Sequence, residues 1–201
     1  MPPKPWIKIG SHRVLANIYS KELISQKYIN PANGNEVDWG LFHATKTTVM
    51  IVPIVGHDKI VVIRQFRHAI NQVIWELPAG VIDGNESPED TAKRELLEET
   101  GYKAGRTILM RPETNLWYDP PSFALSHYAC LALNCTKADQ GQRLDENETI
   151  EVNIVDLQEW VIMCQSGAVV SDPMIATTFS ALPFLGIKFQ FTQDGEQYIQ
   201  K

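Results

Sequence analysis

The chain has 201 residues, a formal net charge of −6 at pH 7, and 44% hydrophobic residues, with 12 Gly and 12 Pro. This length allows one ordinary domain and an appendage, and the globular composition excludes disordered, collagen-like and disulfide-scaffold classes. A modestly acidic chain is a poor general binder of nucleic acid or of a membrane surface, because both attract basic proteins. An anionic small substrate stays compatible with this charge, since bound metal ions can supply positive charge.

The three cysteines, Cys130, Cys135 and Cys164, form no Cys-x-x-Cys pair. An odd count without such a pair argues against a disulfide framework or a cysteine-rich zinc site, so we expect three buried thiols and a reducing compartment. No apolar run approaches the roughly 20 residues of a membrane-spanning helix, and the first residues lack the apolar stretch of a signal peptide. The sequence therefore predicts a cytoplasmic protein that does not bind membranes.

Residues 6–42 are typical of a small β-rich unit. Strands are predicted at Val14–Tyr19 and Glu22–Tyr28, and residues 31–35 predict a turn by their Pro, Asn and Gly content. Such a piece is too small to hold a core alone, so it must pack on the main domain or on a partner subunit. We expect a division into an N-terminal unit, residues 1–43, and a main domain, residues 44–201.

The main domain begins with stronger signals. A helix is predicted from Pro88 to about Thr100, because Ser87 suits the N-cap and Gly101 suits the position after the last turn. Strands and helices mix without regular βαβ alternation, which predicts a mixed-sheet α/β (α+β) sandwich. The predicted strands are Thr47–Val55, Lys59–Phe66, Val73–Leu77, Thr107–Met110, Ala124–Leu133 and Thr149–Val155, and two further helices are predicted at Leu157–Gln165 and Pro173–Leu182.

Three carboxylates share one side of the predicted helix. Glu95 and Glu99 are spaced i, i+4, and Glu98 lies on the flank of the same face, so the three repel one another. A hard cation such as Mg²⁺ or Mn²⁺ would relieve this repulsion. Arg94 is spaced to reach Glu98, and the glycine-rich stretch before the helix lets a phosphate approach the backbone. The residues alone leave two interpretations open, a metal site and a solvated acidic face.

The segment Gly80–Tyr102 resembles the Nudix box, Gly-x5-Glu-x7-Arg-Glu-U-x-Glu-Glu-x-Gly-U, where U is aliphatic. Every charged and glycine position is present, and only Tyr102 departs mildly at the last apolar position. The resemblance implies that Glu95, Glu98 and Glu99 are metal ligands for Mg²⁺ or Mn²⁺, with the carbonyl of Ala79 or Gly80 as a further ligand. Glu98 is also carried over as a candidate catalytic residue.

The same resemblance implies a structural pair, a fold and a reaction. Glu86 and Arg94 are expected to hold the glycine-rich loop against the helix. The implied fold is the Nudix α/β/α sandwich with a mixed sheet, here with the small N-terminal β-rich unit. The implied activity is hydrolysis of a nucleoside diphosphate linked to another moiety.

The flanks of the box resemble the ADP-ribose pyrophosphatase branch. Members of that branch carry Gln-U-Arg and Glu-U-Pro-Ala-Gly where this chain has residues 65–67 and 76–80. Arg67 is then expected to meet the substrate phosphates, for which a guanidinium is suited, and Glu76 becomes a candidate substrate-site residue. Residues 145–152 resemble the branch's acidic segment, which implies Glu146 as the first choice for the catalytic base and Glu148 as the second, or as a metal ligand.

One departure concerns specificity. Residues 118–125 keep a proline but lose the glycine and the acidic residue that the branch has in this pocket segment. We therefore expect a broad enzyme that cleaves ADP-ribose and a hexose nucleotide such as GDP-mannose within about tenfold of each other. One aromatic ring among Tyr28, Trp39 and Trp117 is expected to stack on the nucleobase.

The branch also implies an assembly. Its members pair as dimers in which the N-terminal segment reaches the neighbour's site, so we expect a homodimer whose nucleobase pocket draws on both chains.

Two alternative functions stay open. One is a Nudix-like sensor that binds a sugar nucleotide without turnover; such modules typically lose box glutamates and gain a DNA-binding domain, whereas this chain keeps the glutamates and has no basic recognition helix. The other is a Nudix enzyme for a dinucleoside polyphosphate or a nucleoside triphosphate.

Overall fold

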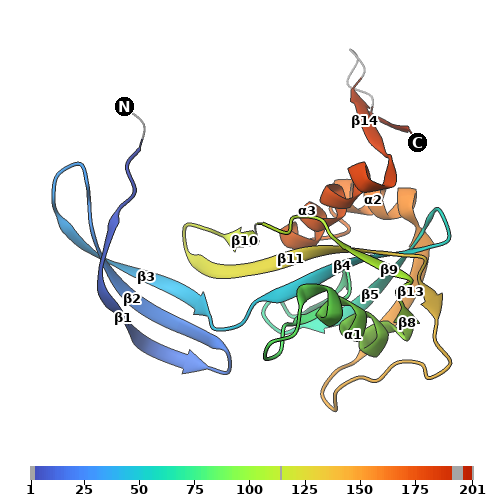
Figure 1. Cartoon of the computed structure of the whole chain (residues 1–201), viewed down its shortest axis with the longest axis horizontal. Helices are drawn as coiled ribbons and strands as arrows, with labels where there is room; N and C mark the ends of the chain where they lie inside the picture. Colours follow the sequence, from blue (N-terminus) through green and yellow to red (C-terminus); the bar gives the residue numbers. More distant parts are fainter. Residues whose placement is uncertain (1–2, 114, 192–196, 201) are drawn as a thin grey trace. The chain divides into compact units, whose positions relative to one another are not determined.

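The computed structural model describes residues 3–113, 115–191 and 197–200. The chain forms two compact units, each drawn in Figure 1. The first unit comprises Met1–Thr47 and Trp117–Ser126, and the second comprises Thr48–Leu116 and His127–Lys201. A short segment from the middle of the chain thus joins the N-terminal strands in one unit.

The first unit is an antiparallel meander of β1 (Ile7–Ile18), β2 (Lys21–Ile29) and β3 (Glu36–Ala44). The chain turns between β2 and β3 at Gly34, whose φ of 76° is left-handed and whose N–H donates to the Asn30 carbonyl at 2.8 Å. The predicted turn at residues 31–35 is confirmed. The middle segment enters through β10 (Leu116–Asp119) and the start of β11 (Phe123–Leu133), where Phe123 pairs with Phe42 in parallel.

The second unit is built on a mixed sheet. Strand β4 (Thr48–Val55) lies between β11, to which it is parallel, and β5 (Lys59–Arg67), to which it is antiparallel. Each of these three strands also has further antiparallel partners. They are β6 (Gln72–Glu76) and β13 (Ile150–Asp156) on β5, β7 (Ala79–Val81) on β4, and β9 (Arg106–Leu109) on β11.

Helices cover both faces of this sheet. Side chains alternate along β4, so that Val49 and Ile51 pack with Leu96 of α1 (Pro88–Thr100), while Met50 and Val52 pack with Trp160 of α2 (Leu157–Ser166). Helix α3 (Asp172–Ala181) joins the α2 side, and Figure 1 shows α1 away from α2 and α3. The expected α/β/α sandwich with a mixed sheet is confirmed.

The predicted strands and helices agree with the structure to within a few residues, apart from β1, which begins at Ile7 rather than Val14. The prediction missed β3, whose side chains are mostly exposed, and several elements of two to four residues. The short elements not yet placed are β8 (Tyr102–Lys103), β12 (Thr136–Lys137), the 3₁₀ helix η1 (Leu182–Leu185), β14 (Lys188–Phe191) and β15 (Gln197–Gln200).

The three cysteines are buried free thiols, as expected, and burial raises the pKa of Cys130 and Cys135 to about 12. Within the described part of the chain, no helix has both the length and the apolar character needed to cross a bilayer.

Candidate active site

Helix α1 begins and ends as its sequence predicts. The Ser87 hydroxyl oxygen accepts a hydrogen bond from the Asp90 N–H at 3.1 Å, and Pro88 opens the first turn. At the other end Gly101 adopts a φ of 71° and donates its N–H to the Leu97 carbonyl. These caps fix the length of the helix and hence the register of the glutamates in its last turns.

Arg94 gathers three of the carboxylates. Its Nη1 donates to Glu95 Oε1 at 2.8 Å and to Glu98 Oε2 at 3.0 Å, and its Nη2 donates to Glu86 Oε2 at 3.0 Å. The Val81 carbonyl accepts a further bond from Nη2 at 3.1 Å. The predicted pairing of Glu86 with Arg94 is thus confirmed, and it ties the loop before α1 to the helix.

Glu99 is the most deeply buried carboxylate of the cluster, with 6% of the residue exposed. Its Oε2 accepts a hydrogen bond from the Ala79 N–H at 2.9 Å. Burial is the main cause that raises the pKa of Glu99 to about 8; the negative charges of Glu95 and Glu148 contribute to this rise, and the hydrogen bond from Ala79 opposes it. In the absence of a cation, this carboxyl group is therefore substantially protonated at neutral pH.

Glu95 lies against the backbone of β7. Burial raises its pKa, which the hydrogen bond and charge of Arg94 lower in part. A Cβ placed on Gly80 would come within 1.8 Å of the Glu95 Cδ, so no side chain larger than hydrogen fits at position 80 in this arrangement. A side chain at position 80 would therefore force the Glu95 carboxylate to move.

Arg67 and Glu76 form an ion pair across the β5–β6 hairpin. The Arg67 Nε lies 3.0 and 2.9 Å from the two Glu76 carboxylate oxygens, and Nη2 lies 2.7 Å from Oε2. Glu76 is 4% exposed, whereas the Arg67 side chain is 42% exposed. The charge of Arg67 also lowers the pKa of Glu99, so this guanidinium acts electrostatically on the carboxylate cluster.

The acidic segment is an exposed loop before β13, which we call the acidic loop, residues 144–149. It is folded on itself, because the Glu148 N–H donates to the Asp145 carbonyl at 3.0 Å and the Asp145 N–H donates to Glu148 Oε2 at 3.3 Å. The charge of Glu148 raises the pKa of both Glu95 and Glu99, so Glu148 acts electrostatically on the cluster. Glu146 is exposed earlier in the same loop.

The donor set of the cluster suits a hard divalent cation, since all its side chains are carboxylates. Two of them are buried at an energetic cost that a cation would offset. No group of three His, Cys, Asp or Glu side chains in residues 3–113, 115–191 and 197–200 is arranged to hold a metal ion as it stands. In this arrangement Arg94 forms ion pairs with both Glu95 and Glu98.

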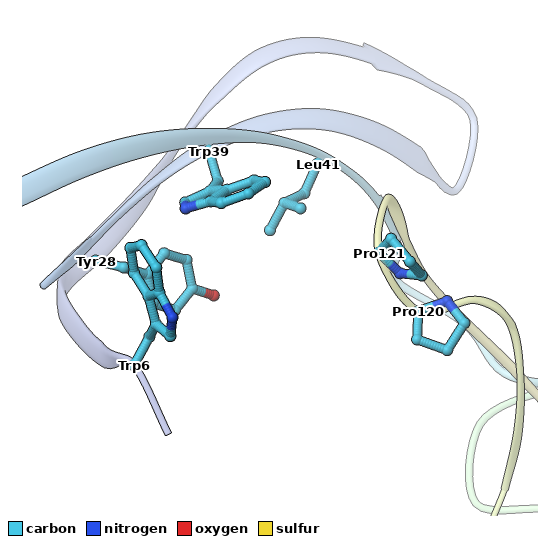
Figure 2. Close-up of a pocket in the computed structure, with 6 residues that line it drawn as sticks. All are labelled: Trp6, Tyr28, Trp39, Leu41, Pro120 and Pro121. Carbon is cyan, nitrogen blue, oxygen red and sulfur yellow. The ribbon is translucent and has the colours of Figure 1, made fainter. Parts of the chain in front are cut away.

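The first unit contains a separate aromatic pocket of about 290 Å³, which Figure 2 shows. Trp6 and Trp39 meet edge to face, with their ring centroids 6.1 Å apart and their planes at 86°. The predicted pair Tyr28 and Trp39 thus line one pocket, while Trp117, 55% exposed, is not among its lining residues. The six residues of this aromatic pocket are Trp6, Tyr28, Trp39, Leu41, Pro120 and Pro121.

Sequence reasoning missed Trp6, Pro120 and Pro121 as pocket residues. Nothing in the local sequence around Trp6 signals a site, because its place beside Trp39 depends on the pairing of three strands. Pro120 and Pro121 did carry a signal, since they lie in the segment predicted to line the substrate pocket.

Comparison with known proteins agrees with this geometry. Residues 44–177 match the model of the NUDIX domain. The chain is 33% identical over 142 residues to the ADP-ribose pyrophosphatase of Bacillus subtilis, and the aligned region covers 70% of this chain and 72% of the relative. It is 30% identical over 146 residues to the ADP-ribose pyrophosphatase of Saccharomyces cerevisiae, covering 64% of this chain and 61% of the relative.

A solved structure described as an ADP compounds hydrolase superposes with a TM-score of 0.78 at 19% identity, covering 92% of this chain and 97% of that one. This likeness agrees with the sandwich fold described above. The domain match takes in more than half of the chain and includes every carboxylate of the cluster on α1, so the chain belongs to the NUDIX domain family.

Proposed function

We propose that the protein is a Mg²⁺-dependent pyrophosphatase of nucleoside diphosphate sugars, releasing a nucleoside monophosphate and a sugar phosphate. The observation that carries the proposal is the carboxylate cluster on α1, in which Glu99 is buried and Glu95 half-buried, together with the charge of Arg67, which acts on Glu99, and that of Glu148, which acts on both. A guanidinium beside a carboxylate cluster suits a substrate with a diphosphate group held in part through a cation. The pyrophosphatase relatives support the same class of substrate.

Glu95, Glu98, Glu99 and the carbonyl of Ala79 would hold Mg²⁺, with Mn²⁺ as a substitute. When bound, the cation neutralises the diphosphate and makes the attacking water more acidic. Arg94 donates to one oxygen of Glu95 and one of Glu98, and each carboxylate has a second oxygen that could contact the cation; Glu99 would bind it in the ionised form.

The proton of the attacking water needs an acceptor in the acidic loop. Of the two candidates, Glu148 is favoured over Glu146, because its charge already acts on the cluster. A general base must lie within hydrogen-bond reach of its proton, directly or through one water molecule. Glu146→Gln and Glu148→Gln, measured side by side, would show which carboxylate the reaction needs.

Arg67 would bind the phosphates with its position fixed by Glu76. The buried Glu76 contacts Nε and Nη2 and so orients the planar guanidinium. Glu76 thus acts on the substrate through Arg67.

The aromatic pocket is proposed to take the nucleobase, by stacking against Tyr28 or Trp39. We further propose a homodimer whose nucleobase pocket draws on both chains, because strands β1–β3 expose several large apolar side chains, among them Ile7, Val14, Leu15 and Ile18. The three free thiols fit a cytoplasmic enzyme. A monomer by light scattering at micromolar concentration would contradict the dimer.

The test is a panel of kcat/KM values for ADP-ribose, GDP-mannose, ADP-glucose, UDP-glucose and a nucleoside triphosphate, each with Mg²⁺. We expect ADP-ribose and at least one hexose nucleotide to fall within about tenfold of each other, about 1.4 kcal/mol. A hundredfold preference for the nucleoside triphosphate would refute the substrate class. A hundredfold preference for ADP-ribose over all others would refute the broad specificity alone.

A further inference from the structure

A short stretch after β12, residues 138–143, caps the end of α1, and we call it the capping segment. The last carbonyl groups of any helix lack partners within the helix. Here the Ala138 N–H donates to the Gly101 carbonyl at 2.8 Å, and the Arg143 N–H donates to the Glu98 carbonyl at 2.8 Å. The fit is close, because a Cβ on Gly101 would lie 2.9 Å from the carbonyl carbon of Gly141.

Gln142 adds a side-chain link that reaches further. Its Nε2 donates to the Glu99 carbonyl at 2.7 Å and also to the Ile150 carbonyl at 3.2 Å. Glu99 is the buried carboxylate of the cluster, and Ile150 is the first residue of β13, 7% exposed and paired with Gln65 of β5. One amide group therefore joins the helix that carries the cluster to the strand that follows the acidic loop.

The acidic loop lies between these two attachments. Residues 144–149 leave the capping segment at Arg143 and return to the sheet at Ile150. Gln142, which precedes the loop, bonds to Ile150, which follows it, and to Glu99 of α1. An exposed loop is held by its ends and by its own few hydrogen bonds, so fixing the ends narrows the positions that Glu148 can take.

We propose that Gln142 is a positioning residue, which holds Glu148 in reach of the reacting water by tying both ends of the acidic loop to the Glu99 backbone. This inference rests on the proposed hydrolase function. Gln142 is not proposed to touch the substrate, and it is itself an exposed residue, so we expect its loss to leave the core intact. A displacement of about 1 Å in a reacting group can cost about a hundredfold in rate.

The experiment compares Gln142→Met with Gln140→Met. Methionine matches the length of glutamine and removes the two hydrogen bonds. Gln140 is an exposed glutamine of the same capping segment, and its Oε1 accepts a bond from Arg143 within the segment. We expect Gln142→Met to lower kcat for ADP-ribose by about tenfold or more with KM within twofold, whereas Gln140→Met keeps both. Gln142→Glu, which has the same size but cannot donate to the two carbonyls when ionised, should lower kcat at least as much.

Hydrogen exchange in the metal-free protein gives a second readout that does not depend on turnover. Peptides covering residues 144–149 should exchange faster in Gln142→Met than in wild type or Gln140→Met, while peptides of β4 and β5 stay unchanged. An active wild type with unchanged kcat and unchanged loop exchange in Gln142→Met overturns the positioning role alone. A wild type that turns over no substrate, with faster loop exchange in the variant, overturns the hydrolase function and leaves the structural link standing.

Discussion

Replacing Glu99 by glutamine should make the metal-free protein more stable at high pH. In the folded protein burial raises the pKa of Glu99 to about 8 from an ordinary value of 4.5. Between pH 4.5 and about 8, Glu99 is therefore protonated in the folded state and ionised in the unfolded state. The free energy of unfolding falls as the pH rises through this range. Glutamine keeps an acceptor for the Ala79 N–H and has no proton to lose.

The magnitude follows from the size of the shift. The pKa of Glu99 rises from 4.5 to about 8, and each pKa unit corresponds to about 1.4 kcal/mol. Ionisation of Glu99 therefore lowers the free energy of unfolding by at most about 5 kcal/mol. This full loss is reached above pH 8, and no loss occurs below pH 4.5. Urea unfolding in the presence of a chelator, from pH 5 to pH 8.5, measures the difference between Glu99→Gln and wild type. We expect that difference to grow with pH in favour of the variant.

The matched control is Glu98→Gln, a carboxylate on the same helix whose side chain is 41% exposed. This substitution removes a carboxylate that stays largely in contact with water, so it separates the effect of burying Glu99 from the effect of losing any carboxylate on the helix. A Glu99→Gln variant whose free energy of unfolding follows the wild-type pH dependence would show that Glu99 is ionised without a cation and that the reasoning is wrong.

Three further predictions concern the site. Gly80→Ala should lower turnover by more than tenfold with the fold retained, because the added Cβ would lie 1.8 Å from the Glu95 Cδ and displace this carboxylate. Initial rates measure turnover and circular dichroism measures the fold; wild-type turnover would contradict the prediction. Arg67→Lys should raise KM for ADP-ribose severalfold, because an ammonium group cannot keep the multiple contacts with Glu76 and offer a planar face to phosphate; an unchanged KM would count against phosphate binding there. Trp39→Ala should weaken the binding of nucleotides by about 1–2 kcal/mol and leave the binding of inorganic pyrophosphate unchanged, as measured by calorimetry. Equal weakening of nucleotide and pyrophosphate binding would exclude a nucleobase role for Trp39.

The sequence predicted the layered core because its signals are local or periodic. Ser87, Pro88 and Gly101 mark the ends of α1 by the conformations these residues favour, and the alternation along β4 follows from two buried faces. Strand β3 escaped prediction although Val37, Trp39 and Leu41 alternate along it, because the acidic residue and the central glycine between them disfavour a strand.

The candidate site was predictable only where its residues are close together in the sequence. The spacing of glutamates on one helix is readable in the sequence, and so is the pairing of Glu86 with Arg94 once the box is seen. The contact of Trp6 with Trp39 and the link from Gln142 to Glu99 and Ile150 depend on chain segments that only the fold brings together.

The most direct test of the central claim is phosphate release from ADP-ribose in the presence of Mg²⁺ and a phosphatase that acts on phosphate monoesters. Cleavage of the diphosphate creates such monoesters, whereas intact ADP-ribose contains none, so phosphate appears only after turnover. We predict release that needs both the protein and Mg²⁺ and that falls by orders of magnitude in Glu99→Gln. No phosphate from ADP-ribose or from any sugar nucleotide of the panel, with binding retained, would contradict the hydrolase and support a sensor.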